Sequence, residues 1–561
     1  MKKSGNFGAL VQNEQIKISK RLGTWILIII MIALSLGTPV FLNWAFEYEK
    51  SSYNYNNEIK DKNPQVEWQT ELDIVKEVIA TGKEHEYKDE NGNVTGSTWY
   101  LGDDGTEAKY KIKTLEYYLT FPDIKEKDWR IDALTYVEGY RGGTDELKIN
   151  QDVGMVEVTE DEVVGDDVFV TESGFKQLIT DAEADKRVKE LETLIRNDDW
   201  RGYLELRKNY MLIDNGIPAD TKYDDIVSSN TNLKKEEAEK VQANSWIYFY
   251  RLEFDIEPTM SHQSIWQEDE YANKDWKNVL LARVQMARSS IAEYNALDED
   301  EREAYMEVSH STDLNTVKTS EYRFKHNIEE DLGSELAEFD PANAGFSSML
   351  ALMASMVSTM AMMVIVVLAG KIVADEFSAG TIKFLLINPT SRTKIFFAKW
   401  LVLMLWSIGL FVVFLALQLG VIALIFGGTE PIGYVLALGD SVIGFKGLAA
   451  AVVYYALVFV KVPIMATMAI CISSLFKSSS FAVGISIVVA TIAPTITQLL
   501  SLIPKFNLGK YMIFANIDLA NIVSGNTVFV GHNLGAALIV IAVHMVLFLG
   551  IGWYSFKRRQ V

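Results

Sequence analysis

The sequence predicts a polytopic α-helical membrane protein with six transmembrane helices and a large α+β extracellular domain inserted between the first and the second. Three observations predict this architecture: six long apolar runs, basic residues gathered on one side of those runs, and a long acidic segment after the first run. The hydrocarbon core of a bilayer is about 30 Å thick, so a spanning helix needs about 20 apolar residues. Six runs meet that length: residues 22–46, 346–373, 398–426, 447–476, 481–503 and 534–554.

The acidic charge of the chain is confined to the segment between the first two runs. The whole chain of 561 residues has a net charge of −21. Residues 45–345 contain 68 Asp and Glu against 35 Lys and Arg, whereas the remaining residues contain 6 acidic and 18 basic ones. This acidic balance argues against nucleic acid as a partner. The segment 47–345 is also rich in Trp and Tyr, which favours a folded domain over disorder.

Lys and Arg in the short connections predict that both chain ends face the cytoplasm. Basic groups precede the first run, lie between the second and third and between the fourth and fifth, and follow the sixth. We therefore expect a bacterial cytoplasmic-membrane protein with residues 1–21 forming an interfacial helix on membrane lipids and 555–561 forming a cytoplasmic tail. The segments 47–345 and 504–533 should lie outside the cell, the second as a loop or re-entrant segment. Cys471 is the only cysteine, so no internal disulfide can form, which is typical of a Gram-positive surface protein.

The extracellular segment should mix strands and helices. Its first half holds turn signals between β-like runs, and Asp103–Gly105 is expected to turn one of several hairpins. Its second half has helical spacing, with apolar residues on one face of residues 185–213 and similar patterns in 273–294 and 316–332. We expect long helices to rise from the second span and from the first.

The sequence contains no motif for catalysis, metal binding or ATP binding. There is no HExxH and no GxSxG, and the acidic stretch Asp89–Asn93 lacks the glycine and the final glutamate of a calcium loop. No G-x-x-x-x-G-K-[ST] occurs either, so the chain cannot hold ATP phosphates in a P-loop. We expect no catalytic residue, no metal ligand and no cofactor on this chain. A cell-surface enzyme is thereby disfavoured.

The connection between the second and third runs is unusual. It reads "ADEFSAGTIKFLLINPTSRTKIFFAKW" from Ala374 to Trp400, and charges surround an apolar face that Pro389 ends. Residues 374–397 are predicted to form a short cytoplasmic helix and loop. The composition fits a simple membrane-surface connector equally well.

This stretch resembles the type-2 ATP-binding-cassette exporter permeases. In that family an acidic residue precedes Gly-Thr, a Leu pair, a Pro, a Ser-Arg pair and a Lys that enters the next span. The matching residues here are Glu376, Gly380, Thr381, Leu385, Leu386, Pro389, Ser391, Arg392 and Lys399. The segment Asn13–Arg21, "NEQIKISKR", is similar to the start of the same family, and the resemblance covers the two membrane portions, a little under half of the chain.

The resemblance implies that the connection is a coupling helix that docks on a separate ATPase subunit. The working unit would contain two ATPase subunits, which bind ATP and Mg²⁺, and a second permease chain, identical or homologous. Closure of the ATPases would shift the spans between inward- and outward-facing states. The implied coupling residues are Asp375, Glu376, Phe377, Gly380, Thr381, Lys383 and Arg392.

Two ionisable residues fall inside the apolar runs. Lys461 lies near the middle of the fourth run, two residues before Pro463, and His544 lies in the sixth. Ionisable groups at membrane depth are costly and often functional, so both are candidates for a substrate path. For Lys461 the alternative is that it reaches a membrane interface or a crevice lined by protein.

The function expected from these patterns is a permease subunit of an ATP-driven exporter. Its cargo should be apolar or amphipathic, a lipid, peptide or antibiotic, because the spans offer few polar groups, although related permeases also export sodium. The alternative is a membrane-anchored receptor or secretion accessory of the phage-infection-protein type, which has no ATPase. The coupling segment distinguishes the two, because a protein without a motor needs no such element.

Overall fold

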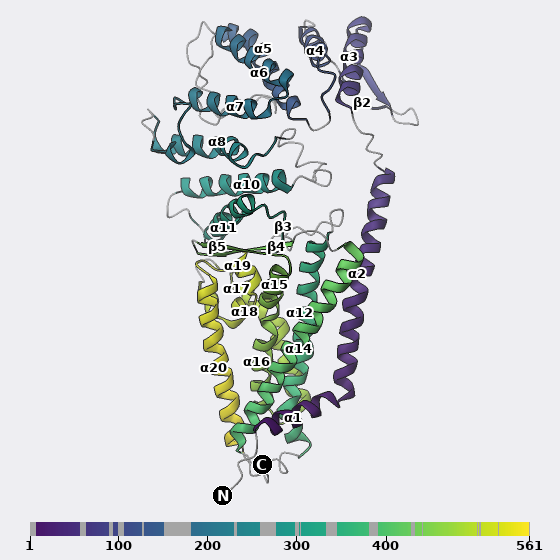
Figure 1. Cartoon of the computed structure of the whole chain (residues 1–561), viewed down its shortest axis with the longest axis vertical. Helices are drawn as coiled ribbons and strands as arrows, with labels where there is room; N and C mark the ends of the chain where they lie inside the picture. Colours follow the sequence, from purple (N-terminus) through teal and green to yellow (C-terminus); the bar gives the residue numbers. More distant parts are fainter. Residues whose placement is uncertain are drawn as a thin grey trace. The chain divides into compact units, whose positions relative to one another are not determined.

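The protein is a multi-pass helical membrane protein that divides into two compact units in a computed structural model (Figure 1). The membrane unit comprises Met1–Tyr53 and Met286–Val561, and the inserted unit comprises Asn54–Gln285. The structure describes residues 7–56, 63–88, 94–98, 106–125, 128–150, 181–228, 233–258, 276–297, 302, 304–332, 345–380, 391–427, 432–439, 441–501, 503, 507–525 and 527–559.

The six predicted spans are confirmed as helices long and apolar enough to cross a membrane. They are α2 (Leu22–Asn56), α12 (Phe346–Ser378), α14 (Arg392–Phe426), the pair α15 (Leu448–Phe459) and α16 (Lys461–Leu475), α17 (Ser479–Ser501) and α20 (Leu534–Arg558). The fourth span is two helices rather than one, because the chain turns at Val460. The predicted extension of the first span is present in α2, whereas α12 begins at Phe346, directly after its N-cap Gly345.

Local sequence explains where several of these helices begin. Ser391 caps α14 by accepting a hydrogen bond from the backbone N–H of Lys394, and Asn533 caps α20 in the same way at Ala536. Such side chains satisfy amide groups that a helix leaves unpaired at its start. The cap at Ser391 lets α14 start at Arg392, earlier than the predicted 398. Helix α12 continues to Ser378, beyond the predicted 373. The connection between them is therefore shorter than the predicted 374–397.

The second and fourth spans form the centre of the membrane unit. In the most apolar 18 residues of each span, 61% of the residues are buried in α12 and 67% in the fourth span. The corresponding shares are only 17% in α17 and 6% in α20. Gly370 lets α12 approach α17, because a Cβ on it would lie 3.1 Å from Cα of Val483. Gly552 of α20 approaches Cys471 of α16 at the same distance. Small residues at such contacts are typical of helix packing in membranes, where close approach replaces the hydrophobic effect.

A small sheet closes one end of the membrane unit. Strand β4 (Ile432–Leu438) lies between β3 (Glu330–Asp331), which is parallel to it, and β5 (Ser441–Lys446), which is antiparallel. Helix α11 (Ala304–His326) lies against this sheet, where Tyr322 occupies the space over Gly444. The predicted extracellular segment 47–345 therefore contributes α11 and β3 to the membrane unit.

The described part of the connection between the fifth and sixth spans contains three short helices. These are η4 (Asn507–Tyr511), α18 (Ile513–Asn516) and α19 (Leu519–Val523). Asn516 is fully buried and hydrogen-bonds to Nε2 of His532 at 2.8 Å. The predicted segment 504–533 is thus packed against α17 and α20, and its depth in a bilayer stays a prediction.

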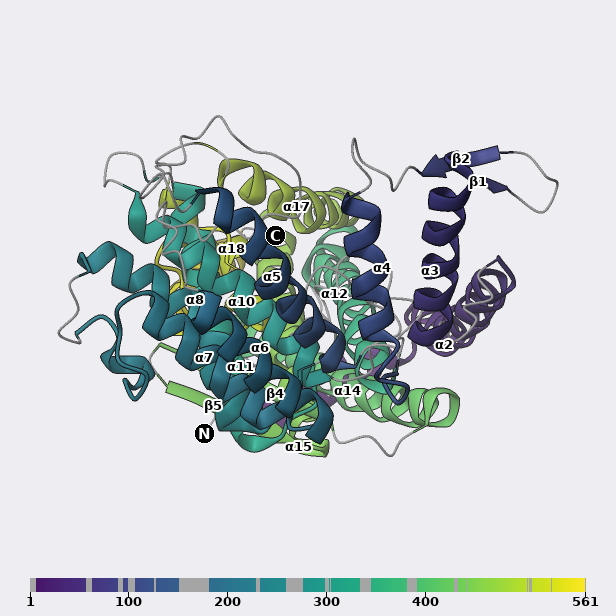
Figure 2. The same ribbon diagram turned by 90° about the horizontal axis from the view of Figure 1, so that it is seen from above.

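The described part of the inserted unit consists of helices and one hairpin. Helices α5 (Trp129–Asn150), α6 (Asp181–Asn197), α7 (Trp200–Asp214) and α8 (Lys235–Phe254) follow one another as successive layers (Figures 1 and 2). Beside them, α3 (Pro64–Thr81) pairs with α4 (Thr106–Tyr118), and the hairpin of β1 (His85–Lys88) and β2 (Val94–Thr98) follows α3. The remaining elements are η2 (Tyr223–Asp225) and α10 (Trp276–Ala296), which crosses the boundary between the units.

Most of the helices predicted for the inserted unit are present, whereas one predicted hairpin is not. The helices predicted in 185–213 and 273–294 are confirmed as α6, α7 and α10, and the one predicted in 316–332 is confirmed only as far as His326, where α11 ends before β3. A second hairpin turning at Asp103–Gly105 is wrong, because the residues after that turn form α4. Helix α4 presents Ala108 and Leu115 to Leu72 and Val75 of α3, and this apolar face with a period of 3.6 overrides the strand-like turn signal. The stretch Asp89–Asn93 lies outside the described residues.

Candidate functional site

Four charged side chains from three helices meet at the end of the membrane unit where α1 (Phe7–Ser19) lies. Glu14 and Lys17 come from α1, Glu376 comes from the last turns of α12, and Lys399 comes from the second turn of α14. We call these four residues the ion cluster. Helix α1 places Glu14 and Lys17 on one face because residues three apart on a helix are neighbours.

The ammonium of Lys399 lies at the centre of the ion cluster. Its Nζ donates to Oε2 of Glu14 at 2.7 Å and to Oε1 of Glu376 at 2.8 Å. Lys17 bridges the same two carboxylates from outside, 2.7 Å from Oε1 of Glu14 and 3.0 Å from Oε1 of Glu376. Two ammonium groups and two carboxylates therefore alternate, and their formal charges cancel.

Three members of the ion cluster are removed from solvent, whereas the side chain of Lys17 is 46% exposed. Lys399 is 0% exposed, Glu14 is 5% exposed and Glu376 is 8% exposed. Burial of one charge is expensive, and the attraction of a partner offsets that cost only where the geometry is good and every charge is paired. The arrangement is therefore sensitive to the loss of Lys399, Glu14 or Glu376, and it joins α1, α12 and α14 at a single point.

The two members from α1 have shifted pKa values that agree with this pairing. Burial tends to raise the pKa of Glu14, but the nearby charge of Lys399 and the hydrogen bonds from Lys17 and Lys399 outweigh burial and hold it below its ordinary value. Burial tends to lower the pKa of Lys17, but its hydrogen bond to Glu14 and the charge of Glu376 raise it above its ordinary value. Both groups are therefore charged at neutral pH.

A second ion pair lies beside the ion cluster. Nη1 of Arg21, just after α1, lies 3.1 Å from Oδ2 of Asp375, and Ser479 at the start of α17 donates a hydrogen bond to Oδ1 of the same carboxylate. The carboxyl end of a helix carries partial negative charge, so an aspartate there is unfavourable without such partners. Asp375 thus fixes the end of α12 to the segment after α1 and to α17.

The other predicted coupling residues make contacts within the chain. Phe377 packs edge-on against Phe556 at 6.3 Å, and the guanidinium of Arg559 lies 4.3 Å from the centre of its ring. Arg392 donates to the backbone carbonyls of Lys557 and Arg559 at 3.0 and 2.7 Å.

Gly380, two residues after the end of α12, has a φ of +68°, a conformation that glycine adopts without strain. Thr381 and Lys383 lie outside the described residues. The predicted coupling role of these residues stays a prediction.

The structure joins two sequence segments that were noted separately. Asn13–Arg21 and Ala374–Trp400 are more than 350 residues apart, yet they supply every member of the ion cluster. Their ion pairing was not foreseen. The available signal was a glutamate and a lysine three residues apart in an amphipathic segment, together with a lysine inside an apolar run, but sequence alone does not say which charges meet.

The two intramembrane candidates differ in their surroundings. His544 lies in α20 with Nδ1 2.9 Å from the carbonyl of Val540, one turn earlier, so the helix itself satisfies that ring nitrogen. Lys461 lies at the break between α15 and α16, and its Nζ donates to Oγ1 of Thr359 on α12 at 3.2 Å.

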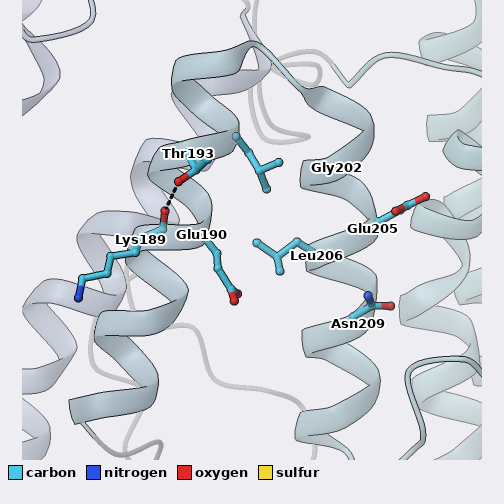
Figure 3. A pocket seen from close by; sticks show the side chains of 8 residues that line it. Lys189, Glu190, Thr193, Gly202, Glu205, Leu206 and Asn209 are labelled. Carbon is cyan, nitrogen blue, oxygen red and sulfur yellow. Dashed lines mark hydrogen bonds between the residues drawn. The ribbon is translucent and has the colours of Figure 1, made fainter.

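The inserted unit has a shallow groove on its surface. It lies between α6 and α7 and has a volume of about 490 Å³ (Figure 3). Glu190 and Leu206 point into it, whereas Lys189 and Glu205 point away. Glu190 accepts a hydrogen bond from Tyr210, so this carboxylate already has a partner within the chain. Among the described residues, no group of His, Cys, Asp and Glu could hold a metal ion.

The chain is similar to a family of unknown function and to two proteins of Bacillus subtilis. A family described as "Protein of unknown function (DUF2705)" matches residues 335–561. The "Uncharacterized protein YhcI" of Bacillus subtilis (strain 168) is 29% identical over 293 residues, which is 52% of this chain and 86% of YhcI.

The "Uncharacterized membrane protein YdbK" of the same organism is 31% identical over 197 residues. The match covers 35% of this chain and 76% of YdbK. With this identity over most of that relative, the chain belongs to one family with the membrane protein YdbK of Bacillus subtilis.

Proposed function

We propose that this chain is the permease subunit of an ATP-driven exporter in the bacterial cytoplasmic membrane. A separate ATPase subunit, present in two copies, would bind ATP and Mg²⁺, and a second permease chain, identical or homologous, would complete the transporter. Both termini and the ion cluster would face the cytoplasm, and the inserted unit would lie outside the cell as a domain that combines helices with a hairpin.

The observation that carries this proposal is the ion cluster. The residues that resemble the exporter family, Glu376 and Lys399 on one segment and the stretch from Asn13 to Arg21 on the other, are in contact through ion pairs, and those of Lys399 are buried. Buried charges are kept in membrane proteins where they serve a mechanical or chemical role. A motor protein that pushes on a rigid junction of three helices would displace the helices themselves. A push on an isolated loop would only bend the loop.

The proposed mechanism follows from how this junction is connected. Residues 381–390 join the end of α12 to the start of α14, and the ion cluster fixes both ends to α1. A displacement of that connection by an ATPase would therefore move α1, α12 and α14 together. Helix α12 packs closely on α16 and α17, so the displacement would pass to the fourth and fifth spans. Packed helices respond to such a push by shifting between discrete arrangements.

The cargo is proposed to be apolar or amphipathic. The helices facing the bilayer, α17 and α20, expose mostly aliphatic side chains, and the described spans contain few charged residues beyond the ion cluster and Lys461. A dehydrated small ion would need rings of oxygen ligands, whereas a lipid or amphipathic peptide needs apolar contact.

A co-purification experiment tests the proposal. The full chain, tagged and extracted from its native membranes, should bring down a P-loop ATPase whose ATP hydrolysis depends on the chain. Lys383→Glu, in the connection, should lower the amount of bound ATPase several-fold by reversing charge at the docking site. Lys446→Glu is the matched control, because Lys446 lies in β5 at the other end of the membrane unit, and it should leave the ATPase bound.

Two results would contradict the proposal. One is that the full chain purifies with no ATP-hydrolysing partner. The other is that Lys383→Glu and Lys446→Glu behave alike, since the connection would then have no special part in docking. The receptor-type alternative predicts both results, because such a protein carries no motor.

A further inference from the structure

Lys461 lies at the middle of a membrane-spanning segment. It is 13 residues after Leu448 and 14 residues before Leu475, the ends of the fourth span. At 1.5 Å per residue, each end is about 20 Å away. The stem of a lysine has four carbons, so its ammonium cannot reach the water at either membrane surface by extending along the helix. A charge at this depth needs compensation from the protein or from a ligand.

The ammonium of Lys461 lies at an accessible surface of the membrane unit rather than in its core. Lys461 is partly buried, and Thr359, to which its Nζ donates at 3.2 Å, is exposed. Thr359 lies at a similar depth, 13 residues after the start of α12 at Phe346. The pair therefore presents one ammonium and one hydroxyl, from two different helices, at the same level of the membrane.

The nearest opposite charge is not in direct contact. Among the residues that the structure describes, none places a carboxylate oxygen within 4.0 Å of Nζ of Lys461. Asp518 is the charged residue whose field acts on it. The carboxylate of Asp518 caps α19 and accepts from Nδ2 of Asn521 at 2.9 Å, so it is already engaged.

Lys461 differs from Lys399 in its burial and in its partners. Lys399 is fully buried and lies within 2.8 Å of two carboxylates, so its charge is neutralised inside the protein. Lys461 is partly buried and has the hydroxyl of Thr359 as its direct partner. The first pattern is that of a structural ion pair, and the second is that of a binding group whose counter-charge comes from elsewhere.

We propose that Lys461 and Thr359 form an intramembrane site for the acidic headgroup of an amphipathic molecule. A phosphate or carboxylate oxygen would accept hydrogen bonds from the ammonium and from the hydroxyl, while the apolar tail of the ligand would lie along the surrounding aliphatic side chains. Asp518 would disfavour a second negative charge, so singly charged headgroups should bind best. This inference concerns binding alone, and it holds whether or not the chain works with an ATPase.

Binding to the detergent-solubilised full chain tests the site without any transport assay. The probes are a short-chain phosphatidylglycerol, the phosphatidylcholine with the same acyl chains, and inorganic phosphate. The anionic lipid should bind at least about tenfold more tightly than its zwitterionic counterpart, as expected for hydrogen bonds to a charged group. Inorganic phosphate should bind much more weakly, because it has no tail.

Two substitutions should change this preference in opposite directions. Lys461→Gln should abolish it, and the variant should fold well, because removing a charge from membrane depth is favourable. Asp518→Asn should strengthen binding of the anionic lipid, since it removes a like charge while Asn still caps α19. Lys477→Gln, which changes an exposed lysine between α16 and α17, is the control and should leave binding unchanged.

Three results would overturn the proposal. The first is a wild-type protein that binds both lipids equally. The second is a preference for the anionic lipid that survives Lys461→Gln. The third is inorganic phosphate binding as tightly as the lipid, which would show that the site takes a free anion and not an amphipathic molecule.

Discussion

Lys399 shows how a single residue can determine the arrangement of three helices. In the sequence it is a lysine at the start of an apolar run, where it could equally extend to the membrane surface. In the fold it is fully buried between Glu14 and Glu376. The charges that surround it come from helices distant in sequence, so its role could not be deduced from its neighbours along the chain.

Removing the charge of Lys399 should destabilise the protein. Lys399→Met keeps most of the side-chain volume but leaves the carboxylates of Glu14 and Glu376 buried with only Lys17 beside them. Breaking a buried ion pair in this way costs about 3 kcal/mol or more. Thermal unfolding of the detergent-solubilised chain should show a lower melting temperature, and the exposed Lys477→Met should not.

Neutralising both glutamates should restore the stability that Lys399→Met loses. Adding Glu14→Gln and Glu376→Gln to Lys399→Met removes the uncompensated charges and should recover much of the lost stability. If the triple variant is less stable than Lys399→Met alone, the ion cluster does not act as a unit.

The docking of α1 should be independent of pH over the physiological range. The pKa of Glu14 is held below its ordinary 4.5, so its contribution to stability is complete above 4.5 and is lost only as pH falls through the lower folded value. The pKa of Lys17 is raised above 10.5, so its contribution is complete below 10.5 and is lost as pH rises through the higher folded value.

Spin labels at Gln12→Cys and Leu405→Cys can measure the separation of α1 and α14. We expect a constant distance between about pH 5 and pH 10, and a longer or broader distribution only outside that window. A transition near pH 6 or 7 would mean that another group controls the contact.

At the scale of secondary-structure elements, the length of each apolar run was enough to predict the membrane-spanning helices. All six predicted runs are helices, and only their ends and the break at Val460 differ. Elements decided by tertiary contact were harder to predict. The sheet of β3, β4 and β5 was not anticipated, because β4 is an apolar run buried on both faces and its short partner β3 comes from the other side of α12 in the sequence. Helix α4 replaced a predicted strand because its apolar face meets α3.

Helix α12 packs so closely on α17 at Gly370 that a larger side chain there should destabilise the protein. Gly370→Val adds side-chain atoms where even a Cβ would lie 3.1 Å from the backbone of Val483, so the helices must separate. Overpacking of this kind costs about 1–3 kcal/mol. Gly409→Val on α14 is the control, because nothing lies within 4 Å of a Cβ at that position. A chemical-denaturation series should show a clear loss for the first variant and a small one for the second, and equal effects would contradict the packing.

At the scale of the whole molecule, the chain is a membrane unit with a second unit inserted after its first span. The family match begins at residue 335 and includes five of the six spans, so it says nothing of the inserted unit. The described part of that unit has its own core, in which Trp129, Leu134, Leu191 and Tyr203 are nearly or fully buried. Sequence composition predicted a folded domain but not the predominance of helix, because charged helices and charged hairpins have similar composition.

The inserted unit should fold without the membrane unit. A fragment covering residues 57–297 should be soluble, mainly helical by circular dichroism, and should unfold in one cooperative transition. Its stability should fall with Leu191→Ala by about 2–5 kcal/mol, the usual cost of truncating a fully buried leucine. A fragment with no cooperative unfolding would show that the unit depends on the rest of the chain.

The most direct test of the proposed function is a cross-link from residue 383 in native membranes. A photo-reactive amino acid placed at Lys383 should form a covalent product with a P-loop ATPase, and the yield should change when ATP is bound. The same amino acid at Lys446 should give no such product. If residue 383 instead cross-links to no ATPase and is labelled from outside intact cells by a membrane-impermeant reagent, the assignment of this chain as an ATP-driven permease is wrong.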